Sequence, residues 1–343
     1  MKILVTGGAG FVGSHLCEHF AGEGFEVIAL DNLKRGEVLG KKINSRYNVD
    51  FLKSLEGVEF VEGDITRFST LKEASKNADV IIHTAAQVAV TASLEDPRRD
   101  FEINALGTFN VLEAARLNDC AVLYCSTNKV YGDNVNHIPI RELDARYEFA
   151  DDTFKDGIPE TFQIDHCEHT PYGSSKLAGD IYVQDYAHLY GLKTGVFRMS
   201  CIYGTRQFGV EDQGWVAWFT IAALTGKPIT IYGDGKQVRD VLYVTDLVAA
   251  FDAFLKSGLA GEVFNIGGGP ENTLSLLELI EILERLAGKE ITPRYDDWRP
   301  SDQKVYVSHI GKARKLLGWR PRVSPEEGVE EVVSWVMKNR DIL

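Results

Sequence analysis

The chain has 343 residues, of which 44% are hydrophobic, and a formal net charge of −13. This length suits one large or two ordinary domains with a substantial core, and the negative charge argues against nucleic acid as a general partner. The sequence predicts no membrane span and no secretory signal. Its five cysteines are scattered without a C-x-x-C pair, so we expect no disulfide framework, no metal site and a cytoplasmic protein.

The first part of the chain predicts a dinucleotide-binding unit. A short apolar strand, Lys2 to Thr6, leads through a glycine loop into a helix, and a second strand, Phe25 to Leu30, ends at Asp31. Glycines permit a tight turn and let backbone N–H groups approach a pyrophosphate at the helix N-terminus. They follow the pattern G-x-x-G-x-x-G at Gly7, Gly10 and Gly13. A glycine-rich turn that binds no ligand is the alternative.

The acidic residue after the second strand bears on which dinucleotide binds. Asp31 can accept hydrogen bonds from ribose hydroxyls and would repel a 2′-phosphate, which favours NAD over NADP. Lys34 and Arg35 weaken this inference, because a basic residue there could receive the phosphate.

Two further strands are expected to end at the same edge of the sheet. Val58 to Val61 leads to Asp64 and Ile65, and Val80 to His83 leads to Thr84-Ala85-Ala86-Gln87. Ligands of open parallel sheets bind beyond the carboxyl ends of the strands. Asp64 is therefore a candidate to hold adenine, with a strand-end turn acid as the alternative, and the small residues after His83 would let a cofactor approach closely.

The next elements complete the predicted sheet edge. A helix is predicted from Pro97 to Leu117, with Asn104 inside it. This amide either bridges backbone groups near the catalytic helix or lies at the surface. Ser126 and Thr127 follow the strand from Ala121 to Cys125, so they are expected at the carboxyl edge of the sheet, where ligands bind.

A tyrosine and a lysine four residues apart, Tyr172 and Lys176, share one face of the following predicted helix. Thr170 can cap this helix, and Pro171 suits its first turn. An ammonium beside a phenol favours phenolate, and lowering the phenol pKa by about 3 units needs roughly 4 kcal/mol. Lys176 and a cationic nicotinamide are expected to supply it. Tyr172 would then act as acid and base on a sugar hydroxyl that Thr127 holds. From spacing alone, an ordinary amphipathic helix is equally compatible.

The rest of the chain predicts an insertion and a smaller second region. Residues 134 to 169 lack clear periodicity and are expected to form a long loop or lid, and Thr194 to Met199 is a further strand. Cys201 either contacts substrate or packs in the core. Guanidinium groups suit bidentate phosphate recognition, and three lie in loops marked by glycine, proline or aromatic residues: Arg206, Arg239 and Arg299. A single loop arginine is more often a solvated surface charge.

Together these motifs resemble the nucleotide-sugar epimerases of the extended short-chain dehydrogenase/reductase family. The resemblance runs nearly end to end and rests on residues 6–13, 64–65, 126–127, 130–132, Tyr172 with Lys176, 239–240 and 265–268. It implies a Thr127–Tyr172–Lys176 catalytic triad, tightly held NAD, and a homodimer or homotetramer formed through helices that flank the sheet.

The predicted site residues follow from these motifs and from the resemblance. The cofactor is expected to contact Gly7, Gly10, Phe11, Val12, Gly13, Asp31, Asn32, Arg35, Asp64, Ile65, Ala85, Ala86, Gln87, Asn104, Ser126, Tyr172 and Lys176. The substrate, a nucleotide-diphosphate sugar, is expected to contact Thr127, Asn128, Lys129, Cys201, Arg206, Gln207, Arg239 and Arg299. We expect neither nucleic acid nor membrane as a partner.

A narrower resemblance is to the 2-epimerases of CDP-linked 3,6-dideoxyhexoses such as CDP-paratose and CDP-tyvelose. It rests on residues 126–133, 169–173 and 203–215. Dehydratases of the wider family carry an acidic pair directly after the catalytic threonine, whereas this chain has Asn128 and Lys129, so dehydration is disfavoured. A UDP-hexose 4-epimerase with the same triad is the alternative, and a non-catalytic NAD-binding regulatory protein is a third, less favoured hypothesis.

The expected fold class is α/β: a Rossmann-type doubly wound parallel sheet with a smaller α/β C-terminal substrate domain. We expect residues 1–199 plus about 236–265 to form the NAD-binding domain. Residues from about 200 to 235 and 266–343 would form the nucleotide-sugar-binding domain.

Overall fold

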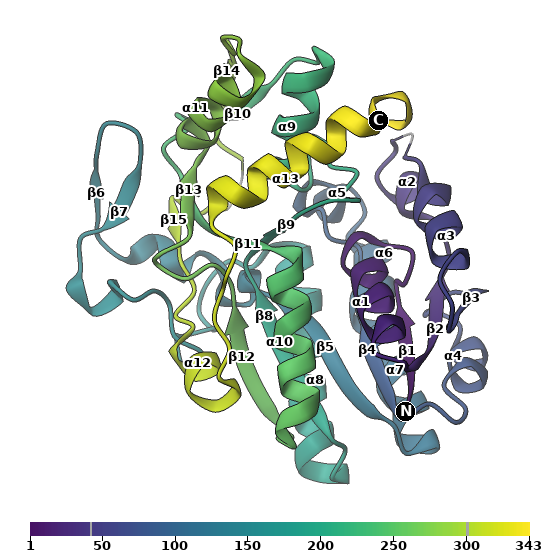
Figure 1. The fold of residues 1–343 in the computed structure, drawn as a ribbon. Helices are drawn as coiled ribbons and strands as arrows, with labels where there is room; N and C mark the ends of the chain where they lie inside the picture. Colours follow the sequence, from purple (N-terminus) through teal and green to yellow (C-terminus); the bar gives the residue numbers. More distant parts are fainter. Residues whose placement is uncertain (42, 300–301) are drawn as a thin grey trace. The chain divides into compact units, whose positions relative to one another are not determined.

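The computed structural model describes residues 1–41, 43–299 and 302–343 (Figure 1). Within them the chain divides into two compact units. The first unit consists of Met1–Val130, Thr170–Arg198 and Phe251–Phe264, and the second of Tyr131–His169, Met199–Ala250 and Asn265–Leu343. No helix in these described ranges is long and apolar enough to cross a membrane.

A seven-stranded sheet is the framework of the first unit. Its strand order is β12-β8-β5-β4-β1-β2-β3, and β1 pairs in parallel with both β2 and β4. This doubly wound order changes direction between β1 and β4 and confirms the predicted Rossmann-type fold class. The strands are β1 Lys2–Thr6, β2 Glu26–Asp31, β3 Val58–Glu62, β4 Val80–His83, β5 Ala121–Thr127, β8 Thr194–Met199 and β12 Glu262–Ile266.

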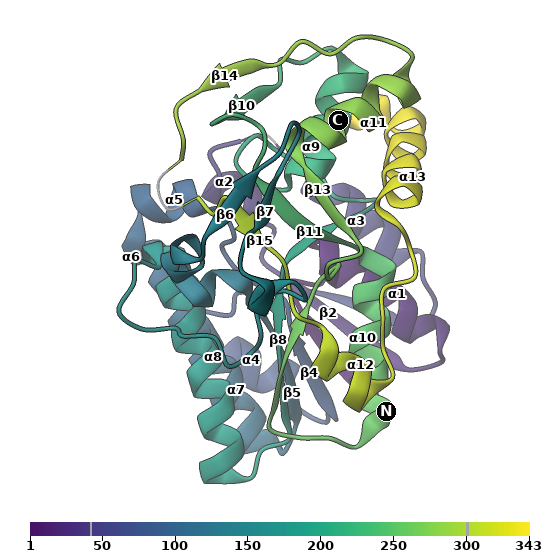
Figure 2. The same cartoon turned by 90° about the vertical axis from the view of Figure 1, so that its left-hand side faces the viewer.

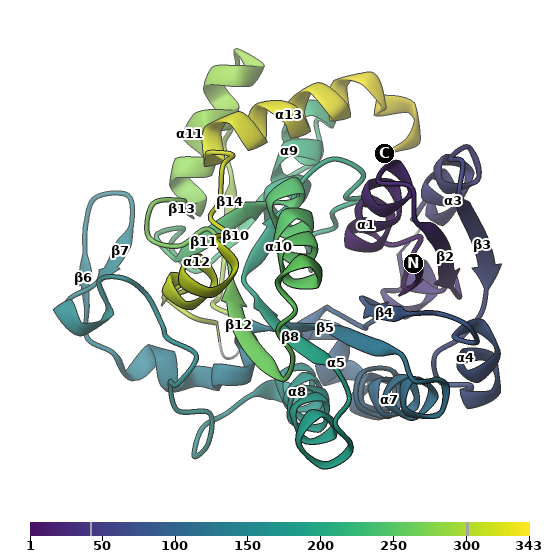
Figure 3. The same cartoon turned by 60° about the horizontal axis from the view of Figure 1, so that its bottom comes forward.

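The central strands are apolar because helices cover both faces of the sheet. In β4 and most of β8 every residue is buried. Figure 3 shows α1 and α3 on one face and α7 and α8 on the other, and Figure 2 shows α7 beside α8. The helices of the first unit are α1 Phe11–Gly22, α2 Arg35–Val38, α3 Ser45–Lys53, α4 Phe68–Ala74, α5 Val90–Glu95, α6 Pro97–Phe101, α7 Gly107–Asn118 and α8 Thr170–Tyr190. Helix α10 Val244–Ser257 begins in residues of the second unit and ends in residues of the first.

The helix predicted from Pro97 to Leu117 is interrupted. After α6 the backbone forms a π-helical segment, Glu102–Leu106, before α7 begins at Gly107. Asn104 lies in this segment and is 1% exposed, so the surface alternative for this residue is wrong. Segments of this kind occur frequently at functional sites.

The second unit combines short strands with three helices that pack on one another. Strand β11 pairs with β9, β13 and β15, and α9, α11 and α13 lie side by side (Figure 1). The strands are β6 Ile140–Glu142, β7 Tyr147–Phe149, β9 Cys201–Tyr203, β10 Thr230–Tyr232, β11 Val238–Tyr243, β13 Thr273–Ser275, β14 Arg294–Asp296 and β15 Val305–Tyr306. The helices are α9 Trp215–Thr225, α11 Leu276–Ala287, α12 Gly311–Leu317 and α13 Pro325–Lys338.

Residues 134–169 are more ordered than the sequence suggested. They contain the antiparallel hairpin β6–β7, so the prediction of a long loop without regular structure is wrong for this part. Its strands are only three residues long, which is too short for periodicity to be read from the sequence. Ile158 donates its N–H to the Val307 oxygen at 2.7 Å, and the Tyr147 hydroxyl donates to Asp234 at 2.5 Å.

These bonds anchor the segment within the second unit. The unit boundaries therefore differ from the predicted domain boundaries at residues 131–169 and 236–250, which cluster with the second unit. The assignment of NAD binding to one unit and sugar-nucleotide binding to the other stays a prediction.

Candidate active site

The glycine loop after β1 has room only for backbone. Gly7 has φ +70°, and a Cβ there would lie 2.7 Å from the Ala85 nitrogen. Gly10 donates its N–H to the Gly7 oxygen at 2.9 Å and forms the N-cap of α1, so no side chain caps that helix. The first turn of α1, Phe11–Ser14, carries no acidic residue. This loop fits the pyrophosphate of a dinucleotide, which backbone N–H groups at a helix N-terminus bind well.

The carboxylate after β2 supports the glycine loop. Asp31 accepts hydrogen bonds from the backbone N–H groups of Ala9 at 3.1 Å and Leu33 at 2.8 Å. Burial raises the pKa of Asp31 in spite of these bonds. Its neighbour Arg35 has its pKa lowered to about 10 by burial, and so remains charged at neutral pH.

Asp64 joins the same corner of the first unit. Its oxygens accept from Asn32 Nδ2 at 3.0 Å, Lys34 Nζ at 3.3 Å and the Thr66 hydroxyl at 2.7 Å. Burial would raise the pKa of Asp64, but a hydrogen bond from the Thr66 backbone N–H at 3.0 Å and these side-chain bonds outweigh it and lower the pKa to about 2. The next residue, Ile65, is buried against the start of α7 at Gly107. Both the adenine role and the turn role of Asp64 remain compatible with this geometry.

The three residues of the predicted triad come together in the interior of the first unit. Thr127 ends β5, and Tyr172 and Lys176 lie one turn apart on α8; they are 7%, 8% and 3% exposed. The Thr127 hydroxyl hydrogen-bonds the Tyr172 phenol. Lys176 Nζ donates to the Cys125 carbonyl oxygen at 2.5 Å and lies 4.1 Å from the centre of the Tyr124 ring. An ordinary amphipathic helix would not bury both the phenol and the ammonium.

Burial dominates the electrostatics of Tyr172 and Lys176. Burial raises the pKa of Tyr172 to about 12, although the bond from Thr127 lowers it. Burial also lowers the pKa of Lys176 to about 8. Desolvation penalises both charged forms, so the acidity expected of Tyr172 depends on the cationic nicotinamide as well as on Lys176, and it stays a prediction.

Two charged residues that sequence reasoning missed hold the end of β5. Ser126 donates its hydroxyl to Asp180 Oδ2 at 2.5 Å, and Arg198 of β8 binds the same carboxylate through Nε and a terminal nitrogen, both at 3.0 Å. The ion pair is buried on both sides. Asp180 could have been predicted from the sequence, because it follows Lys176 by four residues on the same helix.

A buried amide network lies next to the triad. Gln87 exchanges two backbone hydrogen bonds with the Asn104 side chain, each of 2.9 Å, and Asn104 Nδ2 also donates to Ser175 Oγ at 3.2 Å. Asp100 Oδ1 accepts from Gln87 Nε2 at 2.8 Å. Asn104 thus bridges the loop after β4 to helix α8. Neither Asp100 nor Ser175 was predicted, since both read as ordinary helix residues.

The predicted substrate residues divide between the units. Beside the triad, the Thr127 hydroxyl donates to Asn128 Oδ1 at 3.3 Å and accepts from the Lys129 backbone N–H at 3.2 Å.

The predicted cofactor residues Val12, Ala85 and Ala86 are half-buried around the glycine loop and the end of β4.

The predicted residues of the second unit are tied to local partners. Arg239 forms an ion pair with Asp302 at 2.6 Å, and Arg299 pairs with Asp212 at 3.3 Å while its guanidinium lies 4.1 Å from the centre of the Tyr232 ring. Arg206 is buried with φ +59°. Gln207 is buried, and its Oε1 has no hydrogen-bond partner among the described residues. Cys201 Sγ accepts from Trp215 Nε1 at 3.4 Å.

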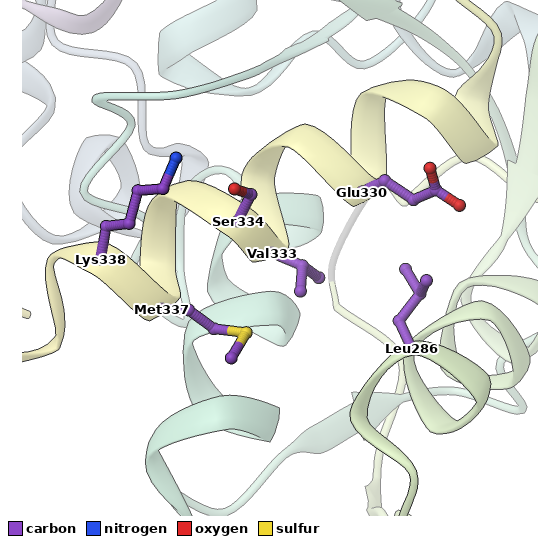
Figure 4. Close-up of a pocket in the computed structure, with 6 residues that line it drawn as sticks. All are labelled: Leu286, Glu330, Val333, Ser334, Met337 and Lys338. Atoms are coloured by element: carbon purple, nitrogen blue, oxygen red, sulfur yellow. The ribbon is translucent and has the colours of Figure 1, made fainter.

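A pocket of about 390 Å³ lies elsewhere in the second unit, between α11 and α13 (Figure 4). It is lined by Leu286, Glu330, Val333, Ser334, Met337 and Lys338. None of these residues belongs to the predicted site, and the described residues hold no cluster of side chains suited to a metal ion. The pocket is therefore separate from the residues that the sequence predicted to be catalytic or ligand-binding.

Comparison with known proteins agrees with this geometry. The model of the NAD dependent epimerase/dehydratase family matches residues 3–267. The chain is 42% identical to CDP-paratose 2-epimerase of Salmonella typhi, over 98% of this chain and 99% of that protein. Its structure is similar to UDP-glucose 4-epimerase of Thermotoga maritima with UDP-glucose, with a TM-score of 0.82, 32% identity and coverage of 99% and 100%. It is also similar to UDP-glucuronic acid 4-epimerase of Bacillus cereus with UDP-glucuronic acid and NAD, with a TM-score of 0.82, 28% identity and coverage of 99% and 100%.

Proposed function

The chain belongs to the NAD dependent epimerase/dehydratase family, and we propose that it inverts C2 of a CDP-linked 3,6-dideoxyhexose, interconverting CDP-paratose and CDP-tyvelose. The resemblance to nucleotide-sugar epimerases noted in the sequence is thereby confirmed. The protein is an enzyme, its cofactor is NAD, and its activity is that of a nucleotide-sugar epimerase. The proposal concerns the nucleotide base of the substrate, the identity of its sugar and the carbon that is inverted.

One observation carries the proposal. The 42% identity to CDP-paratose 2-epimerase extends over almost the whole of both chains, so it includes the second unit, where substrate specificity is expected to lie. Asn128 and Lys129 add a chemical argument, because neither side chain can serve as the carboxylate that removal of water would require.

The residues of the triad divide the work of proton transfer. Bound NAD supplies a hydride acceptor and a positive charge that favours the phenolate. Tyr172 takes the proton of the sugar hydroxyl as a ketone forms, and returns it when the ketone is reduced on its other face. Thr127 hydrogen-bonds the reacting oxygen, and Lys176 holds positive charge one turn away on α8. No net oxidation results, so we expect no steady release of reduced cofactor.

The remaining predicted residues receive roles within this proposal. Gly7, Gly10 and Gly13 would receive the pyrophosphate, Asp31 and Asn32 the ribose, and Asp64 with Ile65 the adenine. Ala85, Ala86, Gln87, Asn104 and Ser126 would line the nicotinamide side. Arg206, Arg239 and Arg299 would hold the substrate diphosphate, and Gln207 and Cys201, which lie close to Arg206 in the sequence, would contact the sugar nucleotide.

Product stereochemistry tests the proposal. Purified protein is incubated separately with CDP-tyvelose and with UDP-glucose, and each mixture is followed by proton NMR, with Tyr172→Phe as the control. We expect CDP-tyvelose to convert partly to CDP-paratose while UDP-glucose stays unchanged. Conversion of UDP-glucose to UDP-galactose alone would reject the 2-epimerase assignment.

The rival function is that of a UDP-hexose 4-epimerase. The similarity to UDP-glucose 4-epimerase of Thermotoga maritima, at 32% identity, favours it, and the same triad would serve at C4. The two functions differ in the carbon presented to Tyr172, which the second unit is expected to determine.

We further propose that the protein forms a homo-oligomer through α7 and α8. These helices expose large apolar side chains of the first unit, among them Ile181 at 50% and Leu189 at 68%. Phe109 and Tyr182 pack edge to face across the two helices, with ring centres 5.8 Å apart. Exposed apolar patches of this kind mark association surfaces.

Sedimentation measurements test the association surface. Ile181→Asp should shift the protein toward monomer, because a carboxylate would be buried without a partner. Leu316→Asp, at an exposed apolar residue of α12, is the matched control and should leave the assembly intact. A wild-type monomer would reject this part of the proposal.

A further inference from the structure

A buried carboxylate lies beside the triad, and no basic side chain among the described residues forms an ion pair with it. Asp100, in α6, is 1% exposed. Its Oδ1 accepts from Gln87 Nε2 at 2.8 Å and from Asn104 Nδ2 at 3.1 Å, and its Oδ2 accepts from Ser175 Oγ at 2.5 Å. Three neutral donors therefore hold this carboxyl group in the interior. Unpaired buried carboxylates are costly and usually have a function.

The hydrogen bonds of Asp100 lead directly to the catalytic helix. Ser175 immediately precedes Lys176, and its hydroxyl lies 3.1 Å from the Tyr172 carbonyl oxygen. Asn104 Nδ2 reaches the same hydroxyl at 3.2 Å from the π-helical segment. Asp100 thus holds the first turns of α8, which carry Tyr172. It does so through the side chains of Ser175 and Asn104.

The charges of the buried site balance only when Asp100 is counted. Lys176 is 3% exposed, and the carboxylates that favour its charged form are Asp180 and Asp100. Asp180 already pairs with Arg198. In the part of the chain that the structure describes, neither Lys176 nor Asp100 makes a direct ion pair. Burial raises the pKa of Asp100, whereas the hydrogen bonds from Ser175 and Gln87 and the charge of Lys176 lower it. Asp100 is therefore the other carboxyl group that can offset the ammonium.

The other titratable groups around the phenol do not supply this charge. From β4, His83 has its pKa lowered to about 3 by burial, so it is neutral. From β5, Tyr124 and Cys125 have their pKa values raised by burial, so they are neutral as well. From α8 itself come Lys176 and Asp180, and from β8 Arg198, whose charges are described above.

We propose that Asp100 is the buried counter-charge of Lys176 and a positioning residue for Tyr172, acting through Ser175 and Asn104. Its negative charge favours the ammonium and opposes the phenolate, so Asp100 sets the pH at which Tyr172 ionises. Only the role of the ionised Tyr172 phenol in turnover depends on the proposed function. Removal of the charge alone should make Tyr172 more acidic.

Titration of the phenol tests this without turnover. The pH dependence of phenolate absorbance is measured for wild type and for Asp100→Asn, each after subtraction of the matching Tyr172→Phe variant. An asparagine can still accept from Gln87 and Asn104 and donate to Ser175, so the network stays bonded. We expect the pKa of Tyr172 to fall by about one unit in Asp100→Asn, as expected for loss of a nearby charge in the interior. An unchanged titration would overturn the proposal.

Two further variants separate charge from position. Glu95→Gln removes an exposed carboxylate at the end of the neighbouring helix α5 and should leave the titration unchanged. Ser175→Ala keeps the charge of Asp100 but breaks its link to α8. It should leave the Tyr172 pKa near the wild-type value and lower kcat with little change in KM. A fall in the Tyr172 pKa in Ser175→Ala equal to that in Asp100→Asn would assign the effect to the hydrogen bond instead.

A stability cycle decides the matter if Asp100→Asn folds poorly. Melting temperatures are compared for Asp100→Asn, Lys176→Met and the double variant. Counter-charges predict a double variant more stable than the sum of the two single losses, because neither charge is left alone; additive losses would overturn the proposal. A wild-type protein that turns over no nucleotide sugar would refute the proposed function, whereas the titration and the cycle would still decide the role of Asp100.

Discussion

The triad of the first unit and the arginines of the second unit hold their charges in different ways. Lys176 is buried with no direct ion pair among the described residues, and burial lowers its pKa to about 8. Arg239 and Arg299 instead reach carboxylates directly, at 2.6 and 3.3 Å. A guanidinium keeps its charge in such surroundings, whereas an ammonium and a phenol can lose theirs.

Under the proposed function, this difference would suit the two units to different tasks. A phenol can gain and lose a proton and so is suited to proton transfer, although bound NAD would have to lower the raised pKa of Tyr172 for this at neutral pH. A permanently charged group held by an acidic partner is suited to binding an anion, because its orientation is already fixed. Changes in the first unit should therefore act on kcat, and changes among the arginines of the second unit should act on KM.

The largest expected effect is that of Tyr172→Phe. Removing the phenolic hydroxyl should lower kcat by about 10² to 10⁴, the usual contribution of a positioned acid–base group. Binding of NAD, measured by fluorescence titration, should change little. Tyr295→Phe, at an exposed tyrosine of β14, is the control. A Tyr172→Phe enzyme with wild-type kcat would remove this residue from the mechanism.

A smaller effect is expected in the second unit. Arg239→Gln should raise KM for the nucleotide sugar by about 10- to 100-fold, the range for loss of a charge-assisted hydrogen bond, with a much smaller change in kcat. Arg314→Gln, at an exposed arginine of α12, should leave both constants unchanged. A fall in kcat at constant KM would contradict the division of tasks between the units.

The smallest expected effect is on stability and comes from Lys176. Its pKa is lowered in the folded chain from 10.5 to about 8, so the unfolded chain binds more protons between these pH values. The contribution of Lys176 to stability should therefore rise as the pH increases from about 8 to 10.5, by at most about 3 kcal/mol. Chemical denaturation of wild type and Lys176→Met across this range measures it. A difference between the two proteins that does not change with pH would show that Lys176 is not desolvated.

Most of the sheet and the positions of the triad could be predicted from the sequence. Strands such as Val80–His83 are short, fully apolar and followed by small residues, so local pattern determines them. The Tyr172–Lys176 pair lies on a helix whose spacing is visible in the sequence. The glycine loop, likewise, carries its own conformational signature at Gly7.

The rest depended on tertiary contacts that no local pattern records. The raised pKa of Tyr172 could not be predicted, because it comes from burial, which the spacing of Tyr172 and Lys176 does not record. Asp100 and Arg198 look like surface charges in the sequence, yet hydrogen bonds to distant residues make their burial possible. The π-helical segment at Asn104 and the hairpin β6–β7 were missed because each is too short to show a period.

Epimerisation in deuterated water tests the central claim most directly. The enzyme is incubated with CDP-tyvelose in D₂O, and the product is examined by NMR for configuration and for deuterium at C2. If Tyr172 moves only the hydroxyl proton and the carbon-bound hydrogen travels as hydride, CDP-paratose should form with hydrogen retained at C2 and no reduced cofactor should accumulate. Incorporation of solvent deuterium at C2 would contradict this account, because it would mean that the carbon loses a proton instead.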